Sequence, residues 1–246
     1  MKFVIPSLGR SSMINEKTLQ VLKNYNINKQ DIYVFVIKEE YDSYRNKIDK
    51  DINIIIGKKG ISEQRSFISN YFNNNEKIVS LDDDITKILE LKENKLVQIE
   101  SLKELSEKAF DLLEGNGMIG IYPTANPFYM SETLSNDLKF CIGQLRWFYN
   151  TQEIESKRTY TLLEDYEVSL LYCLEKKCLR FNNICVKADF NKLCGGLKNV
   201  ANRDFKAKQE EVNRFYEQYK KYCFISDRET KTGRKIDIRF KSKIKL

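Results

Sequence analysis

The stretch that decides the fold is Ile78-Val79-Ser80-Leu81-Asp82-Asp83-Asp84, a short apolar run that ends in three consecutive carboxylates. The run has the length and residue types of a buried strand. Adjacent carboxylates repel one another, and a hard cation such as Mg²⁺ or Mn²⁺, which prefers oxygen ligands, relieves that repulsion. Ligands of α/β sheets bind at the C-terminal ends of strands, where this triplet lies. The sequence predicts a ligand site here, with a solvated acidic turn as the alternative.

Segments typical of strands and helices alternate along the chain. Apolar runs predict strands at 2–5, 31–37, 53–56, 77–81, 85–91, 95–99, 118–122, 140–148 and 235–240. Helical spacing predicts helices at 15–25, 39–47, 61–71 (with Ser62 as N-cap), 102–115, 163–174 and 212–222. This alternation predicts an α/β fold of βαβ units, a mixed and mostly parallel sheet flanked by helices.

Positive charge is concentrated at the C-terminal end of the chain. Residues 203–246 hold 14 Lys and Arg against 7 Asp and Glu, whereas residues 1–202 are neutral. We expect one α/β domain over residues 1–202, with residues 203–246 forming a basic helix and strand extension packed on it. Such a basic segment is the electrostatic footprint of a polyanionic partner. A lysine-rich tail that serves only solubility is the alternative.

Composition excludes several kinds of chemistry. The 246 residues contain no histidine, which rules out Ser-His-Asp and Cys-His catalysis. The six cysteines are scattered without a Cys-x-x-Cys pair, so a zinc site is not expected and reduced thiols are. The apolar runs are too short to span a membrane, and Pro6 interrupts the N-terminus too early for a signal peptide. We therefore expect a cytoplasmic protein.

Three groups lie at the ends of predicted strands or at the start of a helix. Pro6-Ser7-Leu8-Gly9-Arg10 follows the first strand and brings a cation. Arg65 falls in the first turn of a helix, and a helix N-terminus also favours anions such as a diphosphate; a surface ion pair is its alternative role. In an extended backbone Asp82 and Asp84 share one face while Asp83 points the opposite way. One carboxylate of that Asp-x-Asp pattern is then available to a metal ion and the other to a ribose hydroxyl.

The ordered segments FVIPSLGR, GISEQRSF, IVSLDDDI and LLEDYEVS resemble GT-A-fold glycosyltransferases. More narrowly, IGIYPTANPFYM, LKFCIGQLRWF and CGGL resemble the viral and phage branch related to the TET/JBP-associated and base J glucosyltransferases. The resemblance spans roughly residues 3 to 200. It implies a nucleotide site made by Pro6, Arg10, Arg65, Asp82 and Asp83.

The resemblance also implies metal ligation by Asp84 and Asp82 and a UDP-sugar donor. Many GT-A enzymes add a late histidine ligand, which this chain lacks. Either Asp189 substitutes for it, or the metal ion (Mn²⁺ or Mg²⁺) keeps another water. Gly195-Gly196 either lets the backbone approach the sugar or forms an ordinary turn.

Asp165 is the expected catalytic base, with Glu164 in reserve. The pair opens a predicted helix, where carboxylates also suit the helix dipole, and that is their structural alternative. An inverting transfer needs one carboxylate to take the proton of the acceptor hydroxyl. The resemblance implies transfer of a sugar, with glucose favoured, to a hydroxymethylated pyrimidine in DNA, and the basic C-terminal segment agrees with such an acceptor. The alternatives are transfer to a glycan, lipid or protein, a non-catalytic nucleic-acid-binding module, and a metal-dependent nuclease or nucleotidyltransferase.

Overall fold

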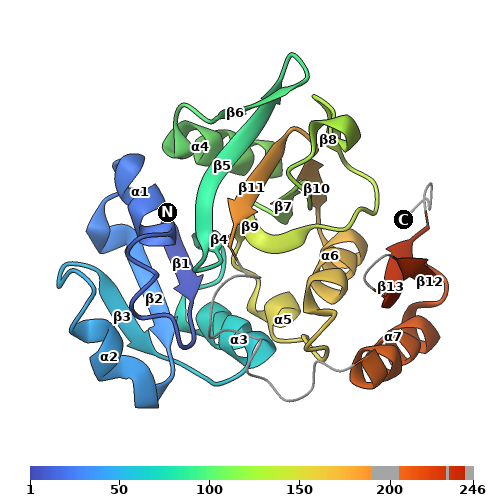
Figure 1. The fold of residues 1–246 in the computed structure, drawn as a ribbon, viewed down its shortest axis with the longest axis horizontal. Helices are drawn as coiled ribbons and strands as arrows, with labels where there is room; N and C mark the ends of the chain where they lie inside the picture. Colours follow the sequence, from blue (N-terminus) through green and yellow to red (C-terminus); the bar gives the residue numbers. More distant parts are fainter. Residues whose placement is uncertain (190–204, 231–232, 242–246) are drawn as a thin grey trace.

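The computed structural model describes residues 1–189, 205–230 and 233–241. An eight-stranded sheet forms its centre, in the order β3-β2-β1-β4-β9-β7-β10-β8 (Figure 1). β1 to β4 run parallel to one another, and β9 enters antiparallel between β4 and β7. The predicted mixed, mostly parallel α/β sheet flanked by helices is confirmed. The strands are β1 (Lys2–Pro6), β2 (Ile32–Val36), β3 (Asn53–Ile56), β4 (Lys77–Leu81), β7 (Met118–Ile121), β8 (Leu134–Ser135), β9 (Ile142–Tyr149) and β10 (Cys178–Phe181).

Helices cover both faces of this sheet because its strands are apolar on both sides. In β4, Val79 and Leu81 join one buried cluster while Ile78 joins the other, as the two-residue period of a strand requires. On the first face lie α1 (Thr18–Asn24), α2 (Tyr41–Arg45) and α4 (Leu102–Leu113). On the second face lie α3 (Ile61–Tyr71), α5 (Gln152–Glu155) and α6 (Glu164–Glu175). Short 3₁₀ turns are η1 (Lys29–Asp31), η2 (Lys38–Glu40) and η3 (Pro127–Tyr129).

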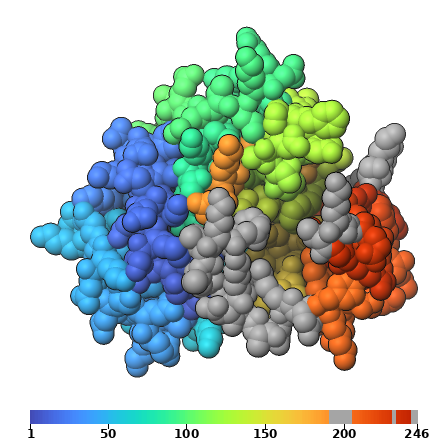
Figure 2. Space-filling model, in the orientation of Figure 1, coloured from blue at the N-terminus to red at the C-terminus, as the bar shows by residue number. Residues whose placement is uncertain are grey.

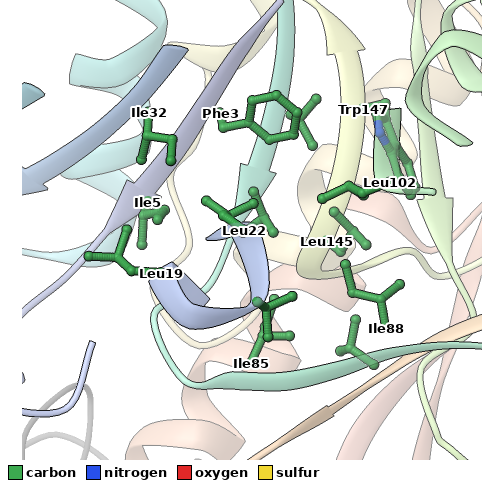
Figure 3. Close-up of a cluster of buried hydrophobic side chains, with 14 of the residues drawn as sticks. Phe3, Ile5, Leu19, Leu22, Ile32, Ile85, Ile88, Leu102, Leu145 and Trp147 are labelled. Atoms are coloured by element: carbon green, nitrogen blue, oxygen red, sulfur yellow. The ribbon is translucent and has the colours of Figure 1, made fainter. Parts of the chain in front are cut away.

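The first cluster fixes β1 and β4 beside each other and anchors α1 over them (Figure 3). Phe3 and Ile5 of β1 point toward Leu22 of α1, and Leu145 and Trp147 extend the cluster along β9. The Trp147 indole N–H donates to Ser106 Oγ at 2.8 Å, so its polar atom is satisfied inside the core. This packing holds the ends of β1 and β4 in fixed relation.

A smaller sheet, β11-β5-β6, lies beside the central one. Its strands are β5 (Ile85–Lys92), β6 (Lys95–Gln98) and β11 (Ile184–Ala188). β5 begins directly after the acidic triplet, so the triplet connects the two sheets.

The C-terminal unit consists of α7 (Phe205–Tyr219) and the hairpin of β12 (Cys223–Thr230) with β13 (Gly233–Phe240). It lies next to α6, across the molecule from β2 and β3, and is drawn in orange and red (Figures 1 and 2). Val212 and Phe215 of α7 and Ile238 of β13 share a buried cluster with Leu163 and Leu170 of the α6 region. The boundary at residue 202 between the α/β domain and the C-terminal extension stays a prediction.

Several predicted elements differ from the structure. α1 begins at Thr18 instead of residue 15, and the helix predicted at 39–47 is a 3₁₀ turn followed by α2. α7 begins at Phe205, well before residue 212, because its first turns are polar and show no apolar period. β8, β10, β11, β12 and α5 were not predicted. β8, β10 and α5 are short and β12 is half polar, whereas β11 is an apolar strand as long as β1 that sequence reasoning missed.

The N-cap predicted for α3 is also wrong. Gly60 is the N-cap, with φ of 100°, a backbone conformation that glycine tolerates and other residues avoid. Ser62 lies inside the first turn and donates its hydroxyl to the Tyr160 carbonyl at 2.6 Å. No helix in the described part of the chain combines the length and apolarity that crossing a membrane requires.

Candidate functional site

A cavity of about 1020 Å³ opens where β1 and β4 end. It contains eight of the nine site residues predicted from the sequence. The loop after β1, the first turn of α3, the β4–β5 turn and the first turn of α6 supply them. They are Pro6, Arg10, Arg65, Asp82, Asp83, Asp84, Glu164 and Asp165. The ninth, Asp189, follows β11; Gly195 and Gly196 lie outside the described residues.

The acidic triplet is a tight turn between β4 and β5 and not an extended strand. The predicted alternation is therefore wrong, because only extended backbone sends neighbouring side chains to opposite faces. Asp83 and Asp84 both accept from Nη1 of Arg10, with 2.9 Å to Asp84. Asp82 turns the other way and accepts from Nη2 of Arg65 at 2.9 Å. Each arginine thus holds a different part of the triplet.

Arg10 is fixed by the loop that follows β1. Its backbone N–H donates to the Tyr44 hydroxyl at 3.0 Å, and that hydroxyl lies 2.7 Å from Ser7 Oγ. Ser7 also donates to Asp83. Burial lowers the pKa of Arg10, but the Asp83 and Asp84 carboxylates outweigh burial and raise it. Arg10 is a permanently charged partner of the triplet.

Arg65 connects the acidic triplet with the two carboxyl groups at the start of α6. Its Nη1 donates to Asp165 at 2.8 Å and also to Glu164, while Nη2 reaches Asp82 and the Gly143 carbonyl at 3.1 Å. The side chain is only 4% exposed. Three carboxylates therefore converge on one buried guanidinium. Its predicted contact with a phosphate stays a prediction, since these groups already occupy both terminal nitrogens.

Gly143, in β9, is a site residue that sequence reasoning missed. Its N–H donates to Asp165 Oδ2 at 2.9 Å, and its carbonyl accepts from Arg65. A Cβ at this position would collide with the side chains of both Arg65 and Asp165. The signal was a lone glycine inside an apolar strand, which often marks a close approach of another group.

A second cluster of buried charged side chains, which sequence reasoning also missed, lies next to the cluster around Arg65. Glu155 accepts from Arg146 at 3.3 Å and from Arg158, and the Tyr172 hydroxyl donates to it at 3.0 Å. Burial acts to raise the pKa of Glu155, but the two guanidinium groups hold it below its usual range. Arg158 Nη1 lies 3.6 Å from Glu164 Oε2 and so connects this cluster to the cavity. The available signal was Arg146 within the apolar run of β9.

The neighbouring carboxyl groups of Glu164 and Asp165 differ in pKa. Burial raises the pKa of Glu164 to about 8. Burial also acts to raise the pKa of Asp165, but Arg65, the hydrogen bond with Glu164 and the Gly143 N–H together hold it below its ordinary value. Asp165 is the more accessible of the two, with 26% of its side chain exposed against 7% for Glu164. Near neutral pH Asp165 is ionised and open to the cavity, while Glu164 holds a proton.

This difference predicts a pH-dependent stability. Between pH 4.5 and about 8 the folded chain retains a proton on Glu164 that the unfolded chain has lost. The free energy of unfolding therefore falls as pH rises, by up to about 1.4 kcal/mol per pH unit. Glu164→Gln keeps the shape but cannot titrate, so its stability should change less over this window. Urea unfolding between about pH 5 and pH 8 measures the slope, with Glu217→Gln on α7 as control. Parallel curves for Glu164→Gln and the wild type would contradict the assignment.

The residues present fit a divalent cation. With Glu164 protonated, the two clusters hold five carboxylates against four guanidinium groups, which leaves one uncompensated negative charge. Burial raises the pKa of Asp82 to about 7 and also raises that of Asp84. The buried Asp84 Oδ1 has no hydrogen-bond partner. A cation would neutralise the charge and satisfy that oxygen.

Asp189 is placed beside the triplet by its backbone. Its N–H donates to the Asp84 carbonyl at 3.2 Å, while its carboxylate pairs with Lys17 at 2.9 Å. Within residues 1–189, 205–230 and 233–241 no three Asp, Glu or Cys side chains gather as a ready metal cluster. A cation bound by one or two carboxylates, with water and substrate phosphate completing its shell, suits this set. Ligation by Asp189 and an additional water both stay predictions, with the Asp189 carboxylate paired to Lys17 in this structure.

Comparison with known proteins gives distant structural likenesses. No protein-family model matches the chain, and a search of curated proteins also found no match. A mannosyltransferase from Pyrobaculum calidifontis, in complex with GDP-Man and Mn²⁺, has 12% identity and a TM-score of 0.48 over 72% of this chain and 53% of its own. The glucosyl-3-phosphoglycerate synthase of Mycobacterium tuberculosis, in complex with Mn²⁺, UDP and phosphoglyceric acid, has 9% identity and a TM-score of 0.45 over 99% and 87%.

The 4-diphosphocytidyl-2C-methyl-D-erythritol synthase of Anaerococcus prevotii has 12% identity and a TM-score of 0.44 over 72% of this chain and 84% of its own. This chain therefore spans about half the length of the mannosyltransferase but most of the two synthases. Likeness at these scores carries no argument about activity, which depends on the site itself.

Proposed function

We propose that the protein is a metal-dependent GT-A-type glycosyltransferase that uses a nucleoside-diphosphate sugar, with UDP-glucose as the first donor to test. One observation carries this proposal. A single cavity brings together the acidic triplet with its excess negative charge, two arginines and an ionised, accessible carboxylate on α6. A nucleotide-sugar transferase needs these three parts: a cation-neutralised diphosphate site, fixed positive charge and a base.

The cavity wall offers different surfaces to different parts of such a donor. Pro6, Leu8 and Ile37 provide apolar surface for a nucleobase. Asp82, 31% exposed at its side chain, can accept hydrogen bonds from ribose hydroxyls. Asp84, with Asp82, would hold the divalent cation, which supplies charge neutralisation for the departing diphosphate. Asp83 serves mainly to fix Arg10 and Ser7.

The transfer is proposed as a single displacement. The acceptor hydroxyl oxygen forms a bond to the anomeric carbon as the bond from that carbon to the diphosphate oxygen breaks. The electron pair of the broken bond leaves with the diphosphate, and the hydroxyl proton passes to Asp165. Gly143 and Arg65 orient this carboxylate through their hydrogen bonds to it. Attack opposite the leaving group inverts the anomeric configuration.

The proposed acceptor is DNA that carries hydroxymethylated pyrimidines. The C-terminal hairpin supports a polyanionic acceptor, because Arg228 and Lys235 face each other across its two strands. Like charges directly opposite are unfavourable in a sheet, and a bound phosphate backbone relieves that repulsion. Arg239 lies opposite Phe224, which is 44% exposed and available to stack on a base. If the acceptor base is in a duplex, it must be flipped out to reach the cavity.

An acceptor panel tests this choice. UDP-glucose and Mn²⁺ are incubated with duplex DNA containing hydroxymethylpyrimidines, with unmodified DNA and with oligosaccharides. We expect a hexose mass gain only on the hydroxymethyl nucleoside. DNA binding should weaken with salt, with a log–log slope of about −3 if three phosphates are contacted. Transfer to a saccharide with no transfer to DNA would contradict the DNA acceptor and favour glycan transfer.

A further inference from the structure

The loop that leads into α6 carries no cap of its own. Leu163 is the N-cap residue of α6 and provides no side-chain hydrogen bond to the helix. The two residues that follow it, Glu164 and Asp165, are the carboxylates of the cavity. Their positions therefore depend on what holds residues 159–162, because a loop with unpaired N–H groups has no fixed path.

Two glutamates from different helices pair the backbone N–H groups of this loop. Glu167, on α6 itself, accepts from Thr159 N at 2.6 Å and from Tyr160 N at 3.2 Å. Glu211, on α7, accepts from Thr161 N at 2.7 Å and from Leu162 N at 2.6 Å. One carboxylate with both oxygens on consecutive N–H groups sets the direction as well as the position of the chain.

Other contacts from α7 reinforce this grip. The Tyr160 hydroxyl donates to Gln218 at 2.7 Å, and the Arg214 guanidinium lies 4.5 Å from the Tyr160 ring centre. Arg214 also donates to the Thr159 carbonyl at 3.2 Å. From the opposite side, Ser62 of α3 donates to the Tyr160 carbonyl at 2.6 Å. The loop is thus held between α3, which carries Arg65, and α7.

We infer that Glu211 is a positioning residue for the proposed base: through Thr161 and Leu162 it sets where the α6 carboxylate of Asp165 lies against the sugar. The expected effect on the rate rests on the proposed function, whereas the clamp, meaning the hydrogen bonds from Thr161 and Leu162 to Glu211, does not. It gives the C-terminal unit a part in the reaction besides any contact with an acceptor. Glu211 also lines the cavity, but both of its carboxylate oxygens pair with the N–H groups of Thr161 and Leu162, so we assign its effect to the backbone of the loop.

Glu211→Gln is the decisive variant. Glutamine keeps the length but has one acceptor oxygen, so one of the two N–H groups faces an amide donor instead. Displacing a catalytic group by about 1 Å can cost about 100-fold in rate, so we expect kcat for UDP release from UDP-glucose to fall about 10- to 100-fold. The KM for UDP-glucose should stay within about twofold, since both Glu211 oxygens are directed at the loop N–H groups. Glu211→Asp keeps the charge but shortens the side chain, so it provides a second test if Glu211→Gln does not fold. Glu217→Gln on the same helix is the matched control.

Hydrogen exchange of the 159–165 segment gives a readout that does not need activity. Faster exchange there in Glu211→Gln, with a lower kcat and unchanged KM, supports the inference. Faster exchange with unchanged kcat overturns it, because the clamp would then be structural only. Unchanged exchange also overturns it. If the wild type neither binds UDP nor releases it from UDP-glucose, the proposed function falls, and the positioning role falls with it even if the loop exchanges faster.

Discussion

Asp165→Asn is expected to lower the rate of sugar transfer by about 10²- to 10⁴-fold, the usual contribution of a general base. The side chain keeps its shape and its oxygen can still accept from the Gly143 N–H. It can no longer take a proton from the acceptor. Because Asp165 lies on α6 and the triplet follows β4, binding of UDP with Mn²⁺ should change little. Radiolabelled sugar transfer and calorimetry measure the two effects separately.

Asp111→Asn, the same chemical change at an exposed position of α4, is the matched control and should retain full activity. Glu164→Gln tests the reserve carboxylate in the same assays. Full activity of Asp165→Asn together with loss of activity in Glu164→Gln would move the base to Glu164. Full activity of both would contradict a carboxylate base on α6.

Arg65→Met is expected to have the largest effect on stability. It removes the buried cation on which Asp82, Glu164 and Asp165 converge and leaves the ionised carboxylates without that partner. Breaking a buried ion pair from one side costs about 3–5 kcal/mol in unfolding free energy. Removing Arg65 raises the folded-state pKa values of these carboxyl groups, because the guanidinium lowers them in the wild type. The loss should therefore shrink toward acid pH, where protonation removes the unpaired charges.

Chemical unfolding at about pH 5 and pH 8 measures this loss and its direction. Arg228→Met, at an exposed position of β12, should change the unfolding free energy by no more than about 0.5 kcal/mol. A loss for Arg65→Met as small as that of the control, or one that does not vary with pH, would show that Arg65 is not the hub of this charge cluster.

Sequence reasoning succeeded where local pattern and local chemistry agree. Apolar runs such as that of β4 located the central strands, and the parallel arrangement followed from their alternation with helices. The grouping of Arg10, Arg65 and the triplet was also predictable, because they follow the neighbouring parallel strands β1, β3 and β4, whose C-terminal ends meet at one edge. Asp165 follows the antiparallel β9, and its place in the site was implied by the resemblance.

The remaining features depend on contacts between distant segments. An acidic turn was an open alternative for the triplet, but nothing near Asp82 in the sequence indicates that its carboxylates divide between two arginines. Gly143 approaches Asp165 only because β9 enters the sheet between β4 and β7. Likewise, Glu211 is 49 positions from Leu162, and its role appears only when α7 packs beside α6. These are consequences of tertiary packing, which propensity and spacing do not encode.

Calorimetric titration of UDP, with and without Mn²⁺, into the wild type and Asp84→Asn tests the central claim most directly. The account predicts UDP binding that requires the metal and is lost in Asp84→Asn, whose Oδ1 in the wild type is buried without a partner. Asp111→Asn should bind like the wild type, and GDP and ADP serve as donor controls. If none of the three nucleotides binds in a metal-dependent way, or if Asp84→Asn binds UDP normally, the triplet is not a nucleotide-sugar site.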